Sequence, residues 1–389
     1  MKKATLIIAA IGSIILFIGF KTRYGRSKND WHPLVKKINV RHKPFSVETA
    51  DLNGDKIKDI VIANGEDSSV TVLTGTGRGN FSETNGLTYP AGYMPNDVVI
   101  ADIDKDGRSD LAIANHDRKH LTILKGDGSG RFSPLRGSPF AVEVTPHTHG
   151  IAVADFNNDG NLDLLTDSWG NNRLVILFGN NSHEFNTVVK YLQVGKHPYQ
   201  RARVADLNKD GNADIITTNL DGNNTTILLG DGKGNFSEAA GSPFACGDSP
   251  FGVAIGDVNR DGNLDLAIIN SPTITSSNAG RDGLTILLGD GKGGFKPITD
   301  SPFTTGKSPS RVAIGDLNSD GLADIVVTNY NSNNISVFIM NTMGIASTYT
   351  LQTGKYPAGI AIADLDGDGK GDIVVANSGE YYIDVIFSR

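Results

Sequence analysis

A nine-residue segment that begins and ends with aspartate occurs seven times in this chain of 389 residues. The copies are DLNGDKIKD from Asp51, DIDKDGRSD from Asp102, DFNNDGNLD from Asp155, DLNKDGNAD from Asp206, DVNRDGNLD from Asp257, DLNSDGLAD from Asp316 and DLDGDGKGD from Asp364. Successive first aspartates are 51, 53, 51, 51, 59 and 48 residues apart. Self-similarity at a period near fifty residues is typical of a repeat architecture, and it constrains the fold more than any single motif does.

Each repeat has the same order of apolar segments around its loop. A segment such as GIAVAD precedes the loop, one such as DLAIAN follows it, and LTILKGDG and GRFSPLRGSPFAV come next. Short runs rich in Val, Ile, Leu and Ala, bounded by Gly, Asn and Asp, are typical of strands. No stretch after residue 30 has a helical period. The pattern therefore predicts an all-β, seven-bladed β-propeller with four-stranded blades over residues 31–389.

The two ends of the repeat region indicate how the ring closes. The seventh repeat stops at YYIDVIFSR, which is its third strand, whereas LVKKINVRHKPFSVETADLNG before the first loop resembles VVKYLQVGKHPYQRARVADLN before the fourth. We expect residues 34–40 to supply the missing fourth strand of blade 7, which would hide open sheet edges. An open solenoid is the alternative, and it would need capping repeats.

Residues 1–30 differ from the rest of the chain. Two lysines precede a run of 17 uncharged, mostly apolar residues, 4–20, and four basic residues follow it. The run is just long enough to span a bilayer, and it lacks a small-x-small cleavage site. We expect a membrane anchor, with a cleaved signal peptide as the alternative. The basic residues after the run would by themselves keep the rest of the chain in the cytoplasm.

The seven loops share a pattern of oxygen donors. Positions 1, 5 and 9 are always Asp, position 3 is Asn or Asp, and position 6 is Gly except at Lys56. Alternating oxygen donors around a sharp turn suit Ca²⁺, which takes about six to eight oxygen ligands, better than they suit Mg²⁺. Three aspartates in each loop and two more at position 3 make 23 of the 43 acidic residues, and such crowding favours a bound cation.

The predicted ligands of up to seven Ca²⁺ ions are the side chains at positions 1, 3, 5 and 9, namely Asp51, Asn53, Asp55, Asp59, Asp102, Asp104, Asp106, Asp110, Asp155, Asn157, Asp159, Asp163, Asp206, Asn208, Asp210, Asp214, Asp257, Asn259, Asp261, Asp265, Asp316, Asn318, Asp320, Asp324, Asp364, Asp366, Asp368 and Asp372. The alternative is a turn that holds its shape without metal, because Asp, Asn and Gly favour turns. An EF-hand is excluded, since its glutamate at position 12 is replaced by Ile, Thr or Val.

These loops and the flanking segments GVAIGD…LAIIN and LTILLGDGKGGF resemble FG-GAP repeats, also called VCBS repeats. Such repeats form the propellers of integrin α-chains and occur in many bacterial surface proteins. The resemblance covers residues 34–389. It implies a propeller whose Ca²⁺ ions lie on the hairpins between the first and second strands of the blades. Blade 1 departs from the pattern at Lys56, where a residue other than glycine must take the turn.

Irregular loops on the opposite face are the predicted place for a partner, because binding residues often lie on variable loops of a regular scaffold. The candidate ligand-binding residues, chosen because aromatics and arginine are favoured at interfaces, are His147, His149, Trp169, Tyr199, Arg201 and Phe251. The alternative is that they are ordinary loop residues. His147 and His149 could also hold a transition metal, although no third ligand is evident in the sequence.

The sequence contains no catalytic motif of the hydrolase, metalloprotease or phosphate-binding types, so we do not expect an enzyme. Nor does it contain, beyond the basic residues that flank the apolar run, a basic run interleaved with aromatics for nucleic acid. Calcium loops favour a location outside the cytoplasm, at the cell surface or in the periplasm, membrane-anchored or secreted. We expect an adhesion or recognition module for a protein or glycan. A polysaccharide-acting hydrolase or lyase on the face without calcium and a scaffold subunit of an envelope complex are the alternatives.

Overall fold

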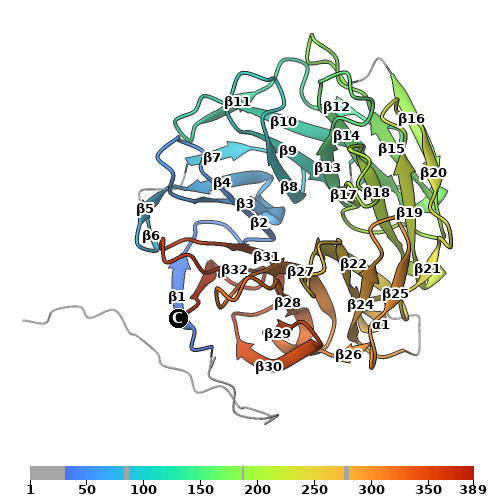
Figure 1. The fold of residues 1–389 in the computed structure, drawn as a ribbon. Coiled ribbons are helices and arrows are strands. Elements are labelled where there is room, and N and C mark those ends of the chain that lie inside the picture. Colours follow the sequence, from blue (N-terminus) through green and yellow to red (C-terminus); the bar gives the residue numbers. More distant parts are fainter. Residues whose placement is uncertain (1–30, 83–86, 117, 186–187, 276–279) are drawn as a thin grey trace, which may run out of the picture.

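Seven antiparallel sheets stand around a common axis in the computed structural model (Figure 1). The structure describes residues 31–82, 87–116, 118–185, 188–275 and 280–389. This arrangement is the predicted seven-bladed β-propeller, and each blade runs from an inner strand near the axis to an outer strand at the rim.

The strands of the blades follow one another from axis to rim. Blade 1 contains β2 (Ser46–Ala50), β3 (Asp59–Asn64), β4 (Ser69–Leu73) and β7 (Leu87–Pro90). Blade 2 contains β8 (Pro95–Ala101), β9 (Asp110–Asn115), β10 (His120–Gly126) and β11 (Phe132–Pro134). Blade 3 contains β13 (Ile151–Ala154), β14 (Asp163–Ser168), β15 (Arg173–Leu177) and β16 (Val189–Gln193). Blade 4 contains β17 (Arg203–Ala205), β18 (Asp214–Asn219), β19 (Asn224–Gly230) and β20 (Phe236–Glu238).

The remaining blades repeat this order. Blade 5 contains β22 (Pro250–Gly256), β23 (Asp265–Asn270), β24 (Gly283–Gly289) and β25 (Phe295–Pro297). Blade 6 contains β27 (Pro309–Gly315), β28 (Asp324–Asn329), β29 (Asn334–Asn341) and β30 (Gly344–Gln352). Blade 7 contains β31 (Pro357–Ala363), β32 (Asp372–Asn377), β33 (Tyr382–Phe387) and β1 (Leu34–Asn39).

Short elements complete the described chain. Three two-residue strands pair with third strands of their blades: β12 (Phe140–Ala141), β21 (Phe244–Ala245) and β26 (Phe303–Thr304). A separate ribbon consists of β5 (Gly75–Gly77) and β6 (Asn80–Phe81). Single helical turns follow five of the second strands: η1 (Gly65–Asp67), η2 (Trp169–Asn171), η3 (Leu220–Gly222), η4 (Tyr330–Ser332) and α1 (Pro272–Thr275).

The second strand of every blade is buried along its whole length, for example DLAIAN in β9 and DIVVTN in β28. A strand covered on both faces reads as a continuous apolar run and lacks an alternating pattern. Seven apolar clusters fill the seven spaces between neighbouring blades, including the space between blades 7 and 1. The core is therefore a closed ring of contacts between blades.

The predicted closure of the ring is confirmed. The blue strand β1 lies beside the red C-terminal strands in Figure 1, and it pairs antiparallel with β33 from Leu34 opposite Phe387 to Asn39 opposite Tyr382. The indole nitrogen of Trp31 adds a hydrogen bond of 3.0 Å to the hydroxyl of Ser388. The open solenoid is thus wrong, because the two ends of the repeat region share one blade.

The predicted membrane segment, residues 4–20, lies outside the described residues. Among the residues that the structure describes, no helix is both long and apolar enough to cross a bilayer.

Candidate functional site

Each nine-residue loop joins the first strand of its blade to the second, as the loop from Asp102 joins β8 to β9. Because the first strands all run in the same direction relative to the axis, the seven loops lie on one face of the propeller. This is the hairpin on which the resemblance placed them.

Backbone amides fix the acidic side chains of each loop. In all seven loops the carboxylate at position 1 accepts the N–H of position 6 at 2.7–3.0 Å. The carboxylate at position 5 accepts the N–H of position 7 at 2.7–3.0 Å. Position 6 has a positive φ that favours glycine, and Lys56 adopts it as well, with φ 67°. The loop from Asp51 therefore keeps the shared turn.

The aspartate at position 9 has a structural role that the sequence did not reveal. It is fully buried in all seven blades. One of its oxygens accepts the N–H of position 2, and the other accepts an N–H at the end of the third strand, as Asp324 does from Leu317 at 3.0 Å and Met340 at 2.9 Å. This side chain thus joins the loop, the second strand and the third strand of its blade.

Burial and neighbouring carboxylates act together on position 9. Desolvation, reinforced by the charges at positions 1 and 5, raises the pKa of Asp163 and Asp324 to about 7. The same causes, burial first, raise the pKa of Asp265 to about 6, and burial with the charges at positions 3 and 5 raises that of Asp372 to about 6. Keeping these aspartates ionised therefore costs free energy, and a bound cation would offset that cost.

The donor set of the loops fits Ca²⁺. In the two loops with Asp at position 3, the carboxylates of positions 1, 3 and 9 each offer an oxygen, and these oxygens lie within 4.8 Å of one another: Asp102, Asp104 and Asp110 in blade 2, and Asp364, Asp366 and Asp372 in blade 7. One oxygen of Asp104 is buried without a hydrogen-bond partner among the described residues. An all-oxygen set with an unused buried acceptor is the chemistry that Ca²⁺ requires.

Five of the six candidate ligand-binding residues lie together on the opposite face. The ring of His149 lies 4.2 Å from that of Tyr199 and 6.0 Å from that of Trp169. Tyr199 in turn lies 5.1 Å from Phe251, and His147 lies 4.8 Å from His149, all between ring centroids. Phe251 is also buried in the apolar cluster between blades 5 and 6. We call these five residues the aromatic cluster.

Arg201, the sixth candidate, is not part of the aromatic cluster, and its side chain enters the centre of the ring. Its guanidinium contacts Asp97 of blade 2, and it reaches Glu48 of blade 1 at 2.6 Å. Burial alone would lower the pKa of Arg201, but the charges of Asp97 and Glu48 outweigh it and raise the pKa. Arg203 and Arg311 line the same small cavity, which has a volume of about 30 Å³.

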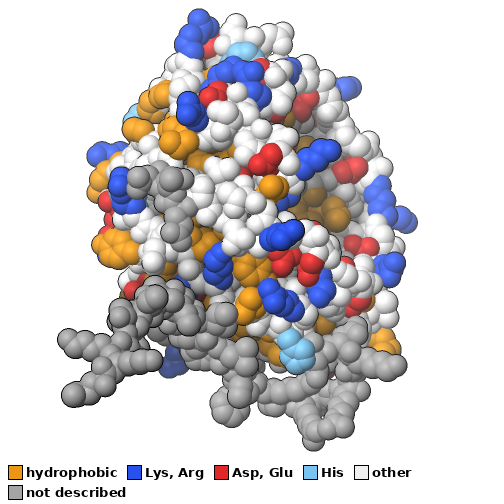
Figure 2. Space-filling model, turned by 90° about the vertical axis from the view of Figure 1, so that its left-hand side faces the viewer, with side chains coloured by type: hydrophobic (Ala, Val, Ile, Leu, Met, Phe, Trp, Pro, Cys, Tyr) orange, Lys and Arg blue, Asp and Glu red, His pale blue; other side chains and the backbone are white. Residues whose placement is uncertain are grey.

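The side of the propeller seen in Figure 2 carries charges of both signs. On the side of the propeller seen in Figure 2, acidic and basic side chains are interspersed, and no large patch of one sign forms there. The charge that stands out in the sequence is instead concentrated in the loops, as their 23 acidic residues require.

A sequence profile of the FG-GAP-like repeat matches residues 51–113, 102–166, 206–268, 274–327 and 316–375. The chain belongs to the FG-GAP-like repeat family. Cartilage acidic protein 1 of Xenopus tropicalis is 23% identical to this FG-GAP protein over 181 residues, which make up 44% of this chain. The matched part is only 28% of that relative, so the comparison covers a fraction of its length.

Solved propellers resemble the whole described ring. BBS1N, in complex with ARL6DN, has 13% identity and a TM-score of 0.59, covering 90% of this chain and 94% of that one. An Agrocybe aegerita lectin that recognises non-reducing terminal N-acetylglucosamine has 20% identity and a TM-score of 0.54, covering 88% and 87%. Virginiamycin B lyase from Staphylococcus aureus has 16% identity and a TM-score of 0.53, covering 91% and 99%. These likenesses show the fold alone.

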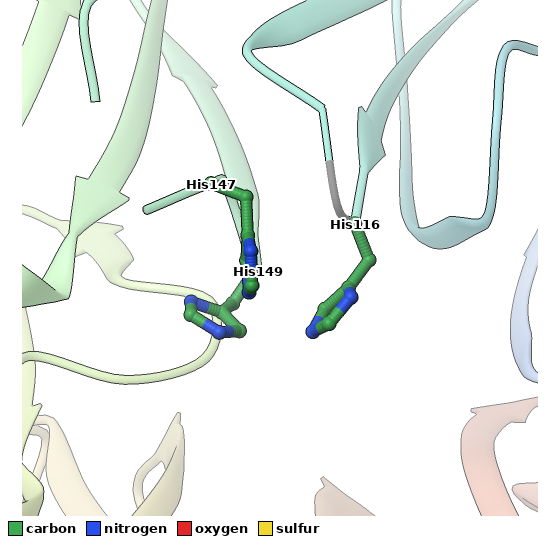
Figure 3. Close-up of side chains that lie close together, drawn as sticks. All are labelled: His116, His147 and His149. Carbon is green, nitrogen blue, oxygen red and sulfur yellow. The ribbon is translucent and has the colours of Figure 1, made fainter. Parts of the chain in front are cut away.

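A third histidine joins His147 and His149 in this FG-GAP propeller. The ring of His116, which directly follows β9, lies 4.1 Å from the ring of His147 and 5.2 Å from that of His149. Figure 3 shows the three rings gathered from two separate segments. His116 was not among the residues predicted from the sequence, because it belongs to blade 2, whereas His147 and His149 lead into blade 3. The sequence signal that could have indicated His116 is its position directly after the second strand of blade 2, on the same face as the loops that enter the inner strands.

A lysine enters the acidic loop of blade 2. Lys125 contacts Asp104, and its ammonium lies 2.7 Å from a carboxylate oxygen of Asp106. Burial alone would raise the pKa of Asp106, but hydrogen bonds from Lys125 and from the backbone of Arg108 lower it below its ordinary value. Blades 4 and 5 carry Leu229 and Leu288 at the matching position. In the loop of blade 2, the side chains of Lys125 and Arg108 would therefore compete with a metal ion for the carboxylates.

Proposed function

We propose that this FG-GAP protein is a calcium-stabilised recognition module that binds a protein or glycan through the face opposite its acidic loops. The observation that carries the proposal is the aromatic cluster, which continues across blades 3, 4 and 5 at the ends of the inner strands. Aromatic side chains in a connected cluster are common anchors of binding surfaces. The indole nitrogen of Trp169 has no hydrogen-bond acceptor among the described residues, so a ligand could supply one.

Similar propellers support this class of ligand without identifying it. BBS1N is a propeller in complex with a protein, and the Agrocybe lectin is a propeller that recognises a terminal sugar. Both share the fold at low identity, so they show what such a ring can present. For this chain the class of ligand is inferred from its own aromatic cluster.

Calcium has a mechanical role in the proposal. Positions 1, 3, 5 and 9 of each loop would hold the ion, which would offset the repulsion among the carboxylates. An ion that binds only the folded chain adds RT ln(1 + [L]/Kd) of stability per site. The ring would then present the opposite face on a rigid frame.

We place the propeller outside the cytoplasm, attached through residues 4–20 or released by their cleavage. Two features support this. The run of 17 residues is long enough to span a bilayer, and loops of this kind suit compartments in which Ca²⁺ is abundant.

A glycan array and a binding assay with the purified full-length protein test the proposal. We expect binding of at least one glycan class or surface protein, weakened at least tenfold by Trp169→Ala. The matched control is Tyr330→Ala, because Tyr330 opens the turn after the second strand of blade 6 just as Trp169 does in blade 3. Equal binding by both variants and the parent protein would contradict the proposed surface.

A polysaccharide-acting hydrolase or lyase is the second candidate, and one observation favours it. The ring nitrogen Nδ1 of His149 lies 2.6 Å from a carboxylate oxygen of Asp167, and both side chains are buried beside Tyr199. Such a pair can position a general base. Turnover of a polysaccharide that is lost in His149→Ala and kept in Asp320→Asn would favour the enzyme over the binding module.

A further inference from the structure

We propose that His116, His147 and His149 form a binding site for a divalent transition metal ion, best matched by Zn²⁺, on the face opposite the acidic loops. Each histidine offers one ring nitrogen, and these nitrogens lie within 4.8 Å of one another. We call the three residues the histidine site. The proposal does not depend on the proposed protein or glycan ligand.

The histidine site lies between two blades that hold it in place. Thr148, which separates the two histidines of blade 3, is fully buried and donates a hydrogen bond of 3.0 Å to the carbonyl of Asn115, next to His116. The side-chain amide of Asn96 donates to the carbonyl of His149 at 2.6 Å. The backbone N–H of His116 donates to Met94 at 2.9 Å. The segments that carry the three rings are therefore fixed to each other before any metal binds.

Asp167 orients the most buried of the three rings. One of its oxygens lies 2.6 Å from Nδ1 of His149, and the other accepts the backbone N–H groups of His149 and Gly150 at 2.8 and 3.0 Å. The His149 and Asp167 side chains are 3% and 1% exposed. With Nδ1–H donating to the carboxylate, Nε2 is left with its lone pair for a metal. A carboxylate behind a ligating histidine is the usual outer shell of such sites.

The other two rings are less buried than that of His149. Nitrogens bound to a tetrahedral Zn²⁺ at about 2.0–2.1 Å lie roughly 3.3 Å apart, so the rings must move closer by about 1.5 Å at most. His116 and His147 are half-buried, so in this proposal their side chains rotate to supply the movement. His149 would remain as the fixed ligand around which the site closes.

The donor type separates this site from the acidic loops. Three imidazole nitrogens suit Zn²⁺, Cu²⁺, Ni²⁺ or Co²⁺, whereas Ca²⁺ takes oxygen ligands. Three protein ligands also leave a coordination position for water or for an atom of a bound molecule. Trp169 and Tyr199 flank His149, so an atom bound there would lie beside these other members of the aromatic cluster.

Cobalt titration of tag-free, full-length protein tests the histidine site. Excess Ca²⁺ is kept in the buffer to saturate the acidic loops, and visible absorption reports Co²⁺ with nitrogen ligands. Competition by Zn²⁺ then gives its affinity. We expect one equivalent of Co²⁺, displaced by Zn²⁺, and a rise in melting temperature when Zn²⁺ is added.

Variants separate the site from adventitious binding. His116→Ala and His147→Ala should each weaken Zn²⁺ more than the about 10- to 100-fold typical of losing an outer-shell partner. Asp167→Asn should weaken Zn²⁺ binding by an amount within that range of about 10- to 100-fold. The control is His120→Ala, because His120 is exposed and lies outside the cluster. Folding is checked by circular dichroism, and His116→Ala remains informative if Asp167→Asn does not fold.

Two results would overturn the proposal. One is folded parent protein that takes up no Co²⁺ or Zn²⁺ under these conditions. The other is uptake that is the same in His116→Ala, His147→Ala and the parent protein, which would show that the metal binds elsewhere on the chain.

Discussion

Replacing Arg201 by methionine should destabilise the whole ring, because this side chain connects three blades. It comes from the segment before β17, and it contacts Asp97 on β8 and Glu48 on β2. The Arg201, Asp97 and Glu48 side chains are 15%, 2% and 31% exposed. Asp97 keeps the N–H of Ile151 as a partner at 3.0 Å, but it loses the guanidinium that contacts it, and only the more distant charges of Arg203 and Arg311 in the same cavity remain.

The size of the effect follows from this burial. Removing one partner of a buried ion pair costs about 3–5 kcal/mol, and nearly all of it should come from Asp97. Glu48 is much more exposed, so its share should be near that of a surface pair, about 0–1 kcal/mol. An unfolding entropy of about 2.1 cal/mol/K per residue then converts about 4 kcal/mol into a melting temperature lower by roughly 5 °C.

Differential scanning calorimetry at one fixed scan rate measures the shift, since a chain of this size can unfold irreversibly. The control is Arg136→Met, because Arg136 and Glu184 are 83% and 48% exposed and lie 4.0 Å apart. This change should cost about 0–1 kcal/mol. Adding Asp97→Asn to Arg201→Met should recover about 1–3 kcal/mol, because the buried charge is then gone. A melting temperature for Arg201→Met within about 1 °C of that of Arg136→Met would refute the reasoning.

Three further predictions concern charge in the ring. Chelation of Ca²⁺ by EDTA should lower the melting temperature measured by calorimetry, and an unchanged value would contradict the calcium proposal. Lys125→Leu removes a cation from the loop of blade 2, so calorimetric titration should show tighter Ca²⁺ binding than in the parent; Lys119→Leu, at an exposed position outside the loop, should leave it unchanged. Burial raises the pKa of Asp384 above its ordinary value of 3.8, so the folded chain binds this proton more tightly than the unfolded chain. Stability should therefore fall as pH rises from 3.8 through the raised pKa, and Asp384→Asn should flatten this slope in urea unfolding at saturating Ca²⁺.

The fold could be predicted because its information is local and repeated. Each second strand is a continuous apolar run, as in DLAIAN of β9, and each loop encodes its own turn. Seven copies at nearly constant spacing left few topologies to consider. The closure by residues 34–40 was also predictable, since that segment resembles the one that precedes the fourth loop.

The candidate sites could be predicted only in part, because their contacts are not local. The four oxygen-donor positions of each loop lie within nine residues, and the pattern identified them. Arg201, however, pairs with Asp97 across 104 residues, so nothing near it in the sequence revealed its place in the centre of the ring. Lys125 reaches Asp104 only because β10 lies beside the loop, and its one signal was a lysine where two other blades have leucine.

The difference between the two faces has one physical origin. A hairpin between two strands of the same blade depends mainly on residues of that blade, so a repeat that copies the blade also copies the loop and its oxygen donors. A site between blades depends on two different segments, and it forms only where both carry suitable side chains. His116 of blade 2 and His149 of blade 3 meet in this way. Blade 2 alone has a histidine directly after its second strand, so the pair occurs at one of the seven junctions in the sequence. Repetition thus multiplies donors on the loop face, whereas a specific site must come from the residues that do not repeat.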